Sequence, residues 1–278
     1  MMEKPMQKFF KLLILVVLSA CSSAPHRSNE TVKESVVVVP GNVVQVHLPT
    51  FYDKETIKCT SGTFPVSQES DPYFIYAESY FSDMKEKACT GENVEIKIIV
   101  KNKDFPFEEL KVDRKRVNLN KKDLARVIRE RKILKNVYSN QNLGLEIDSI
   151  FELPLNSKIT SDYGKRRLYN KERKGQHLGI DFRAKVGKPI RVSNSGKVVL
   201  AKDLFYTGNT VIVYHGLGIF TVYGHLSKIS VLENQSINRG EILGLAGKTG
   251  RVTGPHLHWG VKVNGQWVNG KDLLTLKF

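Results

Sequence analysis

Four histidines and one aspartate lie in three short apolar segments of this sequence. The first segment contains His177 and Asp181, the second contains His225, and the third contains His256 and His258. Side chains alternate between the two faces of a strand, so His256 and His258 would project to one side. The same rule places His177 and Asp181, four residues apart, on one face. We therefore expect strand-borne side chains that converge on one site.

The types and spacing of these residues predict a metal site. Zinc prefers imidazole nitrogen and carboxylate oxygen, and a catalytic zinc site has three protein ligands with an open fourth position. His177, Asp181 and His258 would supply the three ligands. His225 and His256 would then be the catalytic imidazoles, which move protons or stabilise a developing oxyanion. The alternative is a structural zinc site, but such sites are closed by four protein ligands, and the two further histidines argue against it.

The sequence around these histidines resembles a known family. Residues 182–268, with the preceding metal-site motif, resemble the lysostaphin/LytM-type zinc metallopeptidases, which cut peptide bonds in bacterial peptidoglycan. The matching motifs include His177-Leu-Gly-Ile-Asp181, Tyr223-Gly-His225-Leu226 and Gly254-Pro255-His256-Leu-His258. The resemblance implies an antiparallel β peptidase domain, Zn2+ held by His177, Asp181 and His258, and catalytic roles for His225 and His256. All five positions are intact, unlike those of family members that have lost ligands and activate other hydrolases.

We therefore expect a zinc-dependent peptidoglycan hydrolase that cleaves peptide stems or cross-links with a metal-activated water. The expected partners are peptidoglycan peptides, and the expected activity is that of an endopeptidase, with carboxypeptidase action as a possible addition. The alternative is a non-catalytic cell-wall-binding adaptor or an activator of other murein hydrolases. A third hypothesis is an enzyme that its own N-terminal domain keeps latent. We expect a monomer.

The N-terminus predicts export and a lipid anchor. Residues 1–20 combine a basic start with an apolar run that is too short to span a bilayer comfortably. The run ends in Leu18-Ser19-Ala20-Cys21, which resembles the lipobox of bacterial lipoproteins and implies lipidation at Cys21. Ser22 favours the outer membrane, so the protein would face the periplasm within the cell envelope. The alternative is an ordinary cleaved signal peptide with an incidental cysteine.

The net charge of +15 would suit a nucleic-acid-binding protein, but an export signal makes nucleic acid an implausible partner. Attraction to anionic cell-wall polymer is the better interpretation.

The remaining chain predicts a mainly β protein with three parts after a flexible tether at residues 21–34. Strand-like runs at 36–39, 43–46, 72–80 and 94–100 indicate a small β-sandwich-like N-terminal domain at residues 35–118. Cys59 and Cys89 would form a disulfide in an oxidising compartment, because they are the two thiols that remain once Cys21 is lipidated. A metal-ligand role for these two cysteines is the weaker hypothesis, because no histidine lies near either.

A linking helix is predicted at residues 119–140, with Asn120 as its cap. Its apolar stripe is expected to pack between the domains, in preference to binding nucleic acid or membrane. The stripe consists of Leu124, Val127, Ile128, Leu134 and Tyr138.

The peptidase domain is predicted at residues 141–278. Residues 165–174 would form a basic loop, with Arg166, Arg167 and Arg173 either binding substrate carboxylates or merely solvated. Residues 210–215 and 219–223 predict an antiparallel hairpin, in which His215 has a structural role.

Overall fold

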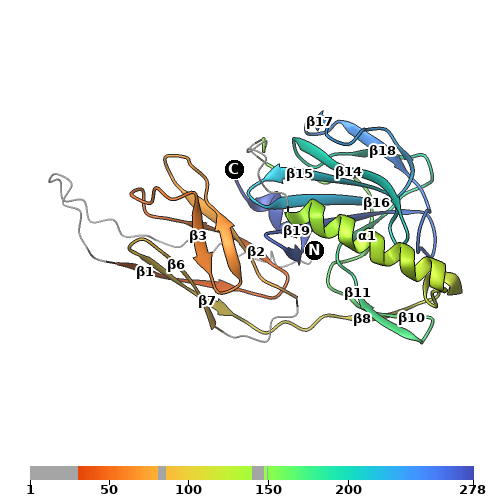
Figure 1. Cartoon of the computed structure of the whole chain (residues 1–278), viewed down its shortest axis with the longest axis horizontal. Coiled ribbons are helices and arrows are strands. Elements are labelled where there is room, and N and C mark those ends of the chain that lie inside the picture. Colours follow the sequence, from red (N-terminus) through yellow and green to blue (C-terminus); the bar gives the residue numbers. More distant parts are fainter. Residues whose placement is uncertain (1–30, 81–85, 140–146, 149) are drawn as a thin grey trace, which may run out of the picture. The chain divides into compact units, whose positions relative to one another are not determined.

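The computed structural model describes residues 31–80, 86–139, 147–148 and 150–278. Within it, Thr31–Phe278 is one compact unit, and its fold is mainly β (Figure 1). The predicted export signal, Cys21 and most of the tether lie outside the described residues. None of the helices in the described ranges has the length and apolar character needed to cross a bilayer.

The first seven strands form a small two-sheet sandwich, as the sequence indicates. One sheet has the order β1-β7-β6-β3-β4 and the other pairs β2 with β5. Apolar side chains of both sheets, such as Ile57, Phe64, Phe74 and Ile98, share one buried core. The strands are β1 (Val32–Val38), β2 (Val43–His47), β3 (Thr56–Cys59), β4 (Gly62–Pro65), β5 (Tyr73–Ala77), β6 (Glu86–Gly91) and β7 (Val94–Val100).

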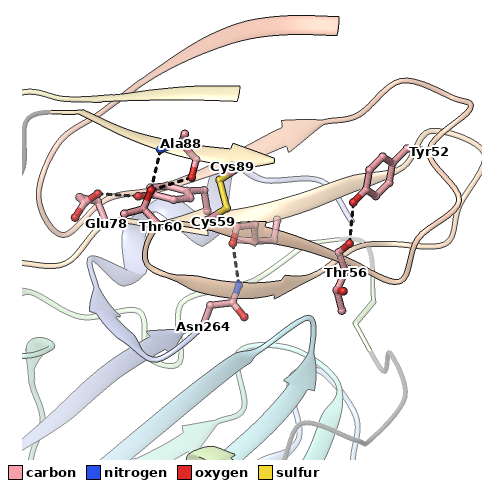
Figure 2. The surroundings of a disulfide bond; sticks show 10 residues. Tyr52, Thr56, Cys59, Thr60, Glu78, Ala88, Cys89 and Asn264 are labelled. Carbon is pink, nitrogen blue, oxygen red and sulfur yellow. Dashed lines mark hydrogen bonds between the residues drawn. A yellow bond between two sulfur atoms is a disulfide. The ribbon is translucent and has the colours of Figure 1, made fainter. Parts of the chain in front are cut away.

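Cys59 and Cys89 face each other across β3 and β6 and are joined by a disulfide in the structure (Figure 2). Both residues are buried in the sandwich core. Beside them, the hydroxyl of Thr60 donates to the carbonyl oxygen of Ala88 and accepts from its amide, each at 3.1 Å. The cross-link and these hydrogen bonds hold the two strands in one register.

β5 is apolar on both faces because each face is covered. Phe74 and Tyr76 point into the sandwich core, whereas Ile75 and Ala77 join the core of the C-terminal part. The side-chain amide of Asn264 donates to the carbonyl oxygen of Ile75 at 2.9 Å (Figure 2). The alternation of side chains along one strand thus gives both cores a common wall.

The C-terminal part contains a ten-stranded sheet whose main path is β17-β14-β15-β16-β19-β12-β9. β13 and β18 pair with each other, β18 also pairs with β16, and β20 pairs with β19. The predicted hairpin is confirmed as β15 and β16, which are antiparallel neighbours. The strands are β9 (Ile159–Ser161), β12 (Ile180–Arg183), β13 (Pro189–Arg191), β14 (Gly196–Leu204), β15 (Gly208–Gly216), β16 (Ile219–Ile229), β17 (Ser236–Ile237), β18 (Ile242–Ala246), β19 (His256–Val263) and β20 (Gln266–Val268).

Residues 165–174 do not form the predicted loop. They belong to a hairpin of β10 (Arg166–Tyr169) and β11 (Arg173–Gln176), and β10 also pairs in parallel with β8 (Phe107–Leu110). Asn170 and Lys171 are two of the three residues between these strands, and their φ values of 52° and 60° are the left-handed conformation of the central positions of a type I′ turn. The amide of Glu172 closes this turn by donating to the carbonyl oxygen of Tyr169 at 2.9 Å. The basic composition of these residues did not indicate a hairpin. The third strand of this small sheet, β8, lies about 60 residues upstream in the sequence.

The helix α1 (Lys121–Ser139) begins where it was predicted. The side chain of Asn120 accepts a hydrogen bond from the amide of Asp123 at 2.8 Å and donates to the Asp123 carboxylate at 2.9 Å, which caps the first turn. Two short 3-10 helices, η1 (Arg114–Arg116) and η2 (Gly270–Thr275), complete the described helices.

The predicted contact face of α1 was partly wrong. Leu124 and Ile128 are 48% and 46% exposed. The helix packs on the outer face of β14, β15 and β16 (Figure 1). It does so through Leu134 and Tyr138 of the predicted stripe together with Ile133 and Val137. A polar contact sets the face that α1 presents to the sheet. The buried Glu130 carboxylate accepts a hydrogen bond from the amide of Phe205 at 2.8 Å and forms an ion pair with Arg126 at 2.6 Å.

Candidate active site

The structure brings His177, Asp181 and His258 together, with one donor atom of each lying within 4.8 Å of the others. Asp181 on β12 and His258 on β19 are directly opposite each other in an antiparallel pair, which places their side chains close together. His177 is not in a strand, contrary to the prediction. It follows β11 in the link to β12. There a Cβ on Gly179 would lie 2.6 Å from the His258 ring and from a backbone oxygen, so this link needs glycine.

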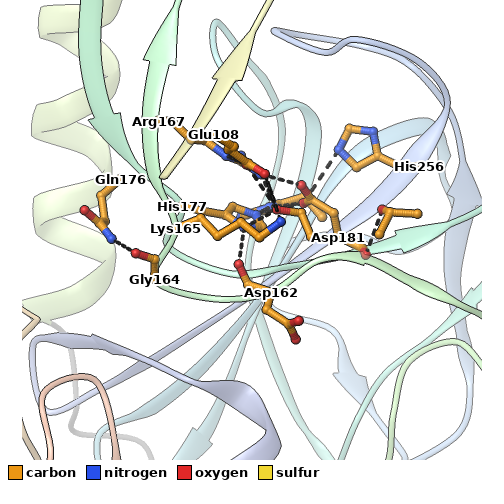
Figure 3. Close-up of polar contacts among 12 residues, drawn as sticks. Glu108, Asp162, Gly164, Lys165, Arg167, Gln176, His177, Asp181 and His256 are labelled. Atoms are coloured by element: carbon orange, nitrogen blue, oxygen red, sulfur yellow. Dashed lines mark hydrogen bonds and ion pairs between the residues drawn. The ribbon is translucent and has the colours of Figure 1, made fainter. Parts of the chain in front are cut away.

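The donor atoms of the three side chains converge. Asp181 Oδ1 lies 2.9 Å from His177 Nε2 and 2.9 Å from His258 Nδ1, and the two nitrogens are 3.3 Å apart. His177 Nδ1 lies 2.8 Å from the carbonyl oxygen of Asp162, so that nitrogen carries the proton and donates it (Figure 3). The lone pair of His177 Nε2 is therefore directed at the cluster.

This donor set fits a tetrahedral zinc ion. Two imidazole nitrogens bound at about 2.0–2.1 Å in a tetrahedral arrangement lie about 3.3–3.4 Å apart, which matches the separation of His177 Nε2 and His258 Nδ1. Three donors from buried or partly buried side chains also leave a fourth position open, as in catalytic sites.

The protonation states suit a metal ligand set. Burial alone would raise the pKa of Asp181, but the interactions of its carboxylate with the His177 and His258 side chains outweigh burial and hold that pKa well below its ordinary value. Burial lowers the pKa of His177, although the Asp181 carboxylate opposes this shift. Asp181 is therefore ionised and His177 neutral near pH 7, which are the forms that bind metal.

His225 lies next to this cluster at an irregularity of β16. The register of β15 against β16 shifts there, and His225 has a φ of 62°, which is rare for a residue with a side chain. Its Nδ1 donates to the carbonyl oxygen of Thr249 at 2.7 Å. This geometry leaves the Nε2 of His225 as an unprotonated acceptor.

His256 is held in the same way. Its Nδ1 donates to the carbonyl oxygen of Gly254 at 2.8 Å, and its Nε2 lies 3.7 Å from Asp181 Oδ1 (Figure 3). The rings of His225 and His256 are 4.7 Å apart between centroids. Burial lowers the pKa of both imidazoles, and the neighbouring imidazoles lower that of His225 further. Two neutral imidazoles thus stand beside three converging ligand atoms.

Sequence reasoning missed a layer of charged residues behind Asp181. Arg167 donates to Asp181 Oδ2 at 2.9 Å, to Ser161 Oγ at 2.9 Å and to Glu108 Oε1 at 2.6 Å (Figure 3). Lys165 binds the other oxygen of Glu108 at 3.0 Å. Burial would raise the pKa of Glu108, but these two cations outweigh burial and lower it. No local signal in the sequence marks Glu108, because it reaches the site through the pairing of β8 with β10.

These residues line a cavity of about 450 Å³. The five residues predicted for the site all contribute to its wall, as do Glu108 and Arg167. The other predicted histidine, His215, lies elsewhere. It is fully buried, and its ring contacts the carbonyl oxygen of Ser195 at 2.7 Å and the hydroxyl of Thr221 at 2.8 Å, contacts that support a structural role.

Comparison with known proteins agrees with this geometry. Residues 175–270 match Peptidase family M23, so the chain contains a peptidase domain of this family, of the lysostaphin/LytM type. Peptidoglycan DD-endopeptidase ShyA of Vibrio cholerae serotype O1 is 44% identical over 119 residues, which are 42% of this chain and 28% of the relative. DD-carboxypeptidase/endopeptidase Mpg of Neisseria meningitidis serogroup B is 39% identical over 113 residues, 41% of this chain and 26% of the relative. The chain therefore spans less than a third of the length of these two relatives.

The fold of the chain has a counterpart among solved structures. A crystal structure of a candidate peptidase M23 from Pseudomonas aeruginosa superposes with a TM-score of 0.66 at 27% identity. The superposed region covers 85% of this chain and 94% of the solved chain, so the similarity extends beyond the peptidase domain.

Proposed function

We propose that this protein is a zinc-dependent peptidoglycan hydrolase that cleaves peptide bonds in the stems or cross-links of the bacterial cell wall. The observation that carries the proposal is the open cluster of His177, Asp181 and His258 with two neutral imidazoles beside it. The named activities of the two relatives, DD-endopeptidase and DD-carboxypeptidase/endopeptidase, support the substrate class.

Each residue has a defined role in this proposal. His177 Nε2, Asp181 Oδ1 and His258 Nδ1 would hold zinc, and Arg167 keeps the second carboxylate oxygen of Asp181 engaged. A zinc ion held there would supply Lewis-acid polarisation of the scissile carbonyl and would lower the pKa of a water molecule. His225 or His256 takes the proton of the attacking water at Nε2 and later delivers it to the leaving amine.

Digestion of purified sacculi, followed by separation of the released peptides, tests this proposal. His225→Ala and His256→Ala should each retain zinc and lose about 10² to 10⁴ in kcat, the usual contribution of a general acid or base. His177→Ala should lose zinc and activity together. His47→Ala is the matched control, because His47 is a half-exposed histidine of the N-terminal sandwich.

A zinc-loaded parent protein that binds sacculi and releases no peptide would contradict the hydrolase and support the adaptor. Parent-level digestion by His225→Ala and His256→Ala would contradict the assigned proton carriers and leave the hydrolase standing.

We also propose that the protein acts in the cell envelope as an outer-membrane lipoprotein facing the periplasm. The lipobox-like sequence ending at Cys21 and the named cell-wall activities of the relatives support this location.

A further inference from the structure

Arg251 in the wall of the active-site cavity has no anionic partner among the residues that the structure describes. Arg251 lies between β18 and β19, five residues before His256, and its guanidinium stacks between two tyrosine rings. The guanidinium carbon is 3.9 Å from the ring centroid of Tyr169 and 4.5 Å from that of Tyr206. The backbone amide of Arg251 donates to the carbonyl oxygen of Tyr206 at 2.8 Å, which fixes the start of the side chain.

The other partly buried arginine of this wall is already neutralised. Arg167 forms ion pairs with both Asp181 and Glu108, which are the two carboxylates that line the cavity. Among the residues that the structure describes, no carboxylate lies within ion-pair distance of the Arg251 guanidinium, and none of its N–H groups has a hydrogen-bond acceptor. The acidic and basic side chains that line the cavity sum to a net charge of +1, and they are Glu108, Asp181, Arg167, Arg183 and Arg251. Arg183 is exposed, so Arg251 is the partly buried cation of this lining that no carboxylate of the described residues neutralises.

The surroundings of Arg251 make an anionic ligand favourable. Burial lowers the pKa of its guanidinium, and the charges of Arg173 and Arg167 lower it further, while Tyr169 and Tyr206 oppose the shift. The guanidinium remains charged at neutral pH, and the two ring faces offset only part of its lost hydration. Its planar fork is also held in one orientation, which suits two parallel hydrogen bonds to a carboxylate.

We propose that Arg251 binds a free carboxylate of the peptide substrate and so selects anionic peptides for this active site. The inference rests on the proposed function, and it names the feature of the substrate that the cavity recognises. Peptidoglycan stems offer such carboxylates both at chain ends and on side branches, and the chemistry of recognition is the same for both.

A purely structural role is the competing explanation, in which Arg251 merely ties the hairpin carrying Tyr169 to the turn carrying Tyr206. The two explanations differ in their dependence on the substrate. If Arg251 binds a carboxylate, its substitution weakens binding only of peptides that carry that carboxylate. If Arg251 has a structural role, its substitution weakens binding of every peptide equally.

The experiment measures kcat and KM on a cross-linked stem peptide with free carboxylates and on forms in which one carboxylate at a time is amidated. Binding of the same peptides is measured by calorimetry in the zinc-loaded His256→Ala protein, in which turnover is slowed about 10²- to 10⁴-fold. Arg251→Met should raise KM and Kd for the free peptide by about 10- to 100-fold and change kcat little, since a charge-assisted bidentate contact is lost. Arg251→Lys should recover part of the affinity, because it keeps the charge and loses the fork.

Amidation of the recognised carboxylate should weaken peptide binding by the parent protein by the same factor. Arg251→Met should bind this amidated peptide no more weakly than the parent does. Which amidated form shows this behaviour distinguishes a terminal carboxylate from a branch carboxylate. Arg129→Met is the charge-matched control, since Arg129 is exposed on α1, and it should bind every peptide like the parent.

Equal losses for all amidated forms, parent-like affinity in Arg251→Met, or absence of binding by the parent would each overturn the inference. Binding that depends on Arg251 and on one carboxylate, in a parent that does not cleave, would support the inference and overturn the hydrolase. Cleavage by the parent protein with kinetics that Arg251→Met leaves unchanged would support the hydrolase and overturn the inference.

Discussion

Replacing Arg167 with Met should weaken zinc binding without removing a ligand. Arg167 is the cation that holds Asp181 Oδ2, and its side chain is only 11% exposed, so solvent cannot replace the three hydrogen bonds that it donates. Loss of a residue that orients a metal ligand typically costs about 10- to 100-fold in metal affinity. We expect a loss of this size in Arg167→Met and a smaller one in Arg167→Lys.

The same substitution should destabilise the zinc-free protein. It leaves the carboxylates of Asp181 and Glu108 without their shared cation, and breaking a buried ion pair by removing one partner costs about 3–5 kcal/mol. Adding Glu108→Gln to Arg167→Met should recover only a small part of this loss, because Glu108 keeps its ion pair with Lys165 when Arg167 is removed. Glu108 is partly exposed, so the recovery should be smaller than the initial loss.

Zinc affinity can be measured by competition with a chromophoric chelator, and stability by urea unfolding of the metal-free protein. Arg126→Met is the matched control, since Arg126 also bridges two carboxylates, those of Glu130 and Asp203, and does not line the active-site cavity. It should lower stability and leave zinc affinity unchanged. Parent-like zinc affinity in Arg167→Met would refute the positioning role of Arg167.

Three further predictions follow from other parts of the chain. Burial lowers the pKa of His215 from 6.5 to about 4, so as the pH falls the unfolded chain binds this proton before the folded protein does. The free energy of unfolding should therefore fall by about 3 kcal/mol as the pH drops from 6.5 to 4. Urea unfolding at several pH values should show a shallower decline in His215→Gln, and an unchanged decline would count against the assignment. Replacing Cys59 and Cys89 with Ser should cost about 2–4 kcal/mol, because the disulfide closes a loop between residues 30 apart; thermal unfolding measures this loss, and two free thiols in protein isolated from the envelope would disprove the cross-link. Cys21→Ser should abolish lipid labelling and release the protein from membranes, and unchanged membrane partitioning would rule out the anchor.

The convergence of the five site residues was predictable because it depends on local rules. Strand alternation places His256 and His258 on one side of β19, and a single antiparallel pairing brings Asp181 opposite His258. The preferences of zinc for imidazole and carboxylate donors then indicate the chemistry. The position of His177 outside a strand did not matter, because Gly179 lets the link approach His258 closely.

Glu108 could not be predicted in this way. It enters the site through a parallel pairing between segments about 60 residues apart, and nothing in the sequence of β8 distinguishes Glu108 from its neighbour Glu109. The same pairing gives Arg167 its partner Glu108, so one of the three arginines that the sequence offers for substrate binding is already engaged. Arg251 remains available in the cavity instead.

The helix α1 shows a similar division. Its start was predictable, because the cap formed by Asn120 and Asp123 is local. Its contact face was not, because the exposure of Leu124 and Ile128 depends on where Glu130 finds a hydrogen-bond donor in the sheet.

The most direct test of the central claim is a crystal structure of the zinc-loaded protein with anomalous scattering recorded at the zinc absorption edge. We predict one zinc ion bound by His177 Nε2, Asp181 Oδ1 and His258 Nδ1, with a nonprotein ligand in the fourth position and with His225 and His256 unligated. A zinc ion closed by four protein ligands, or an anomalous peak away from this cluster, would contradict the claim.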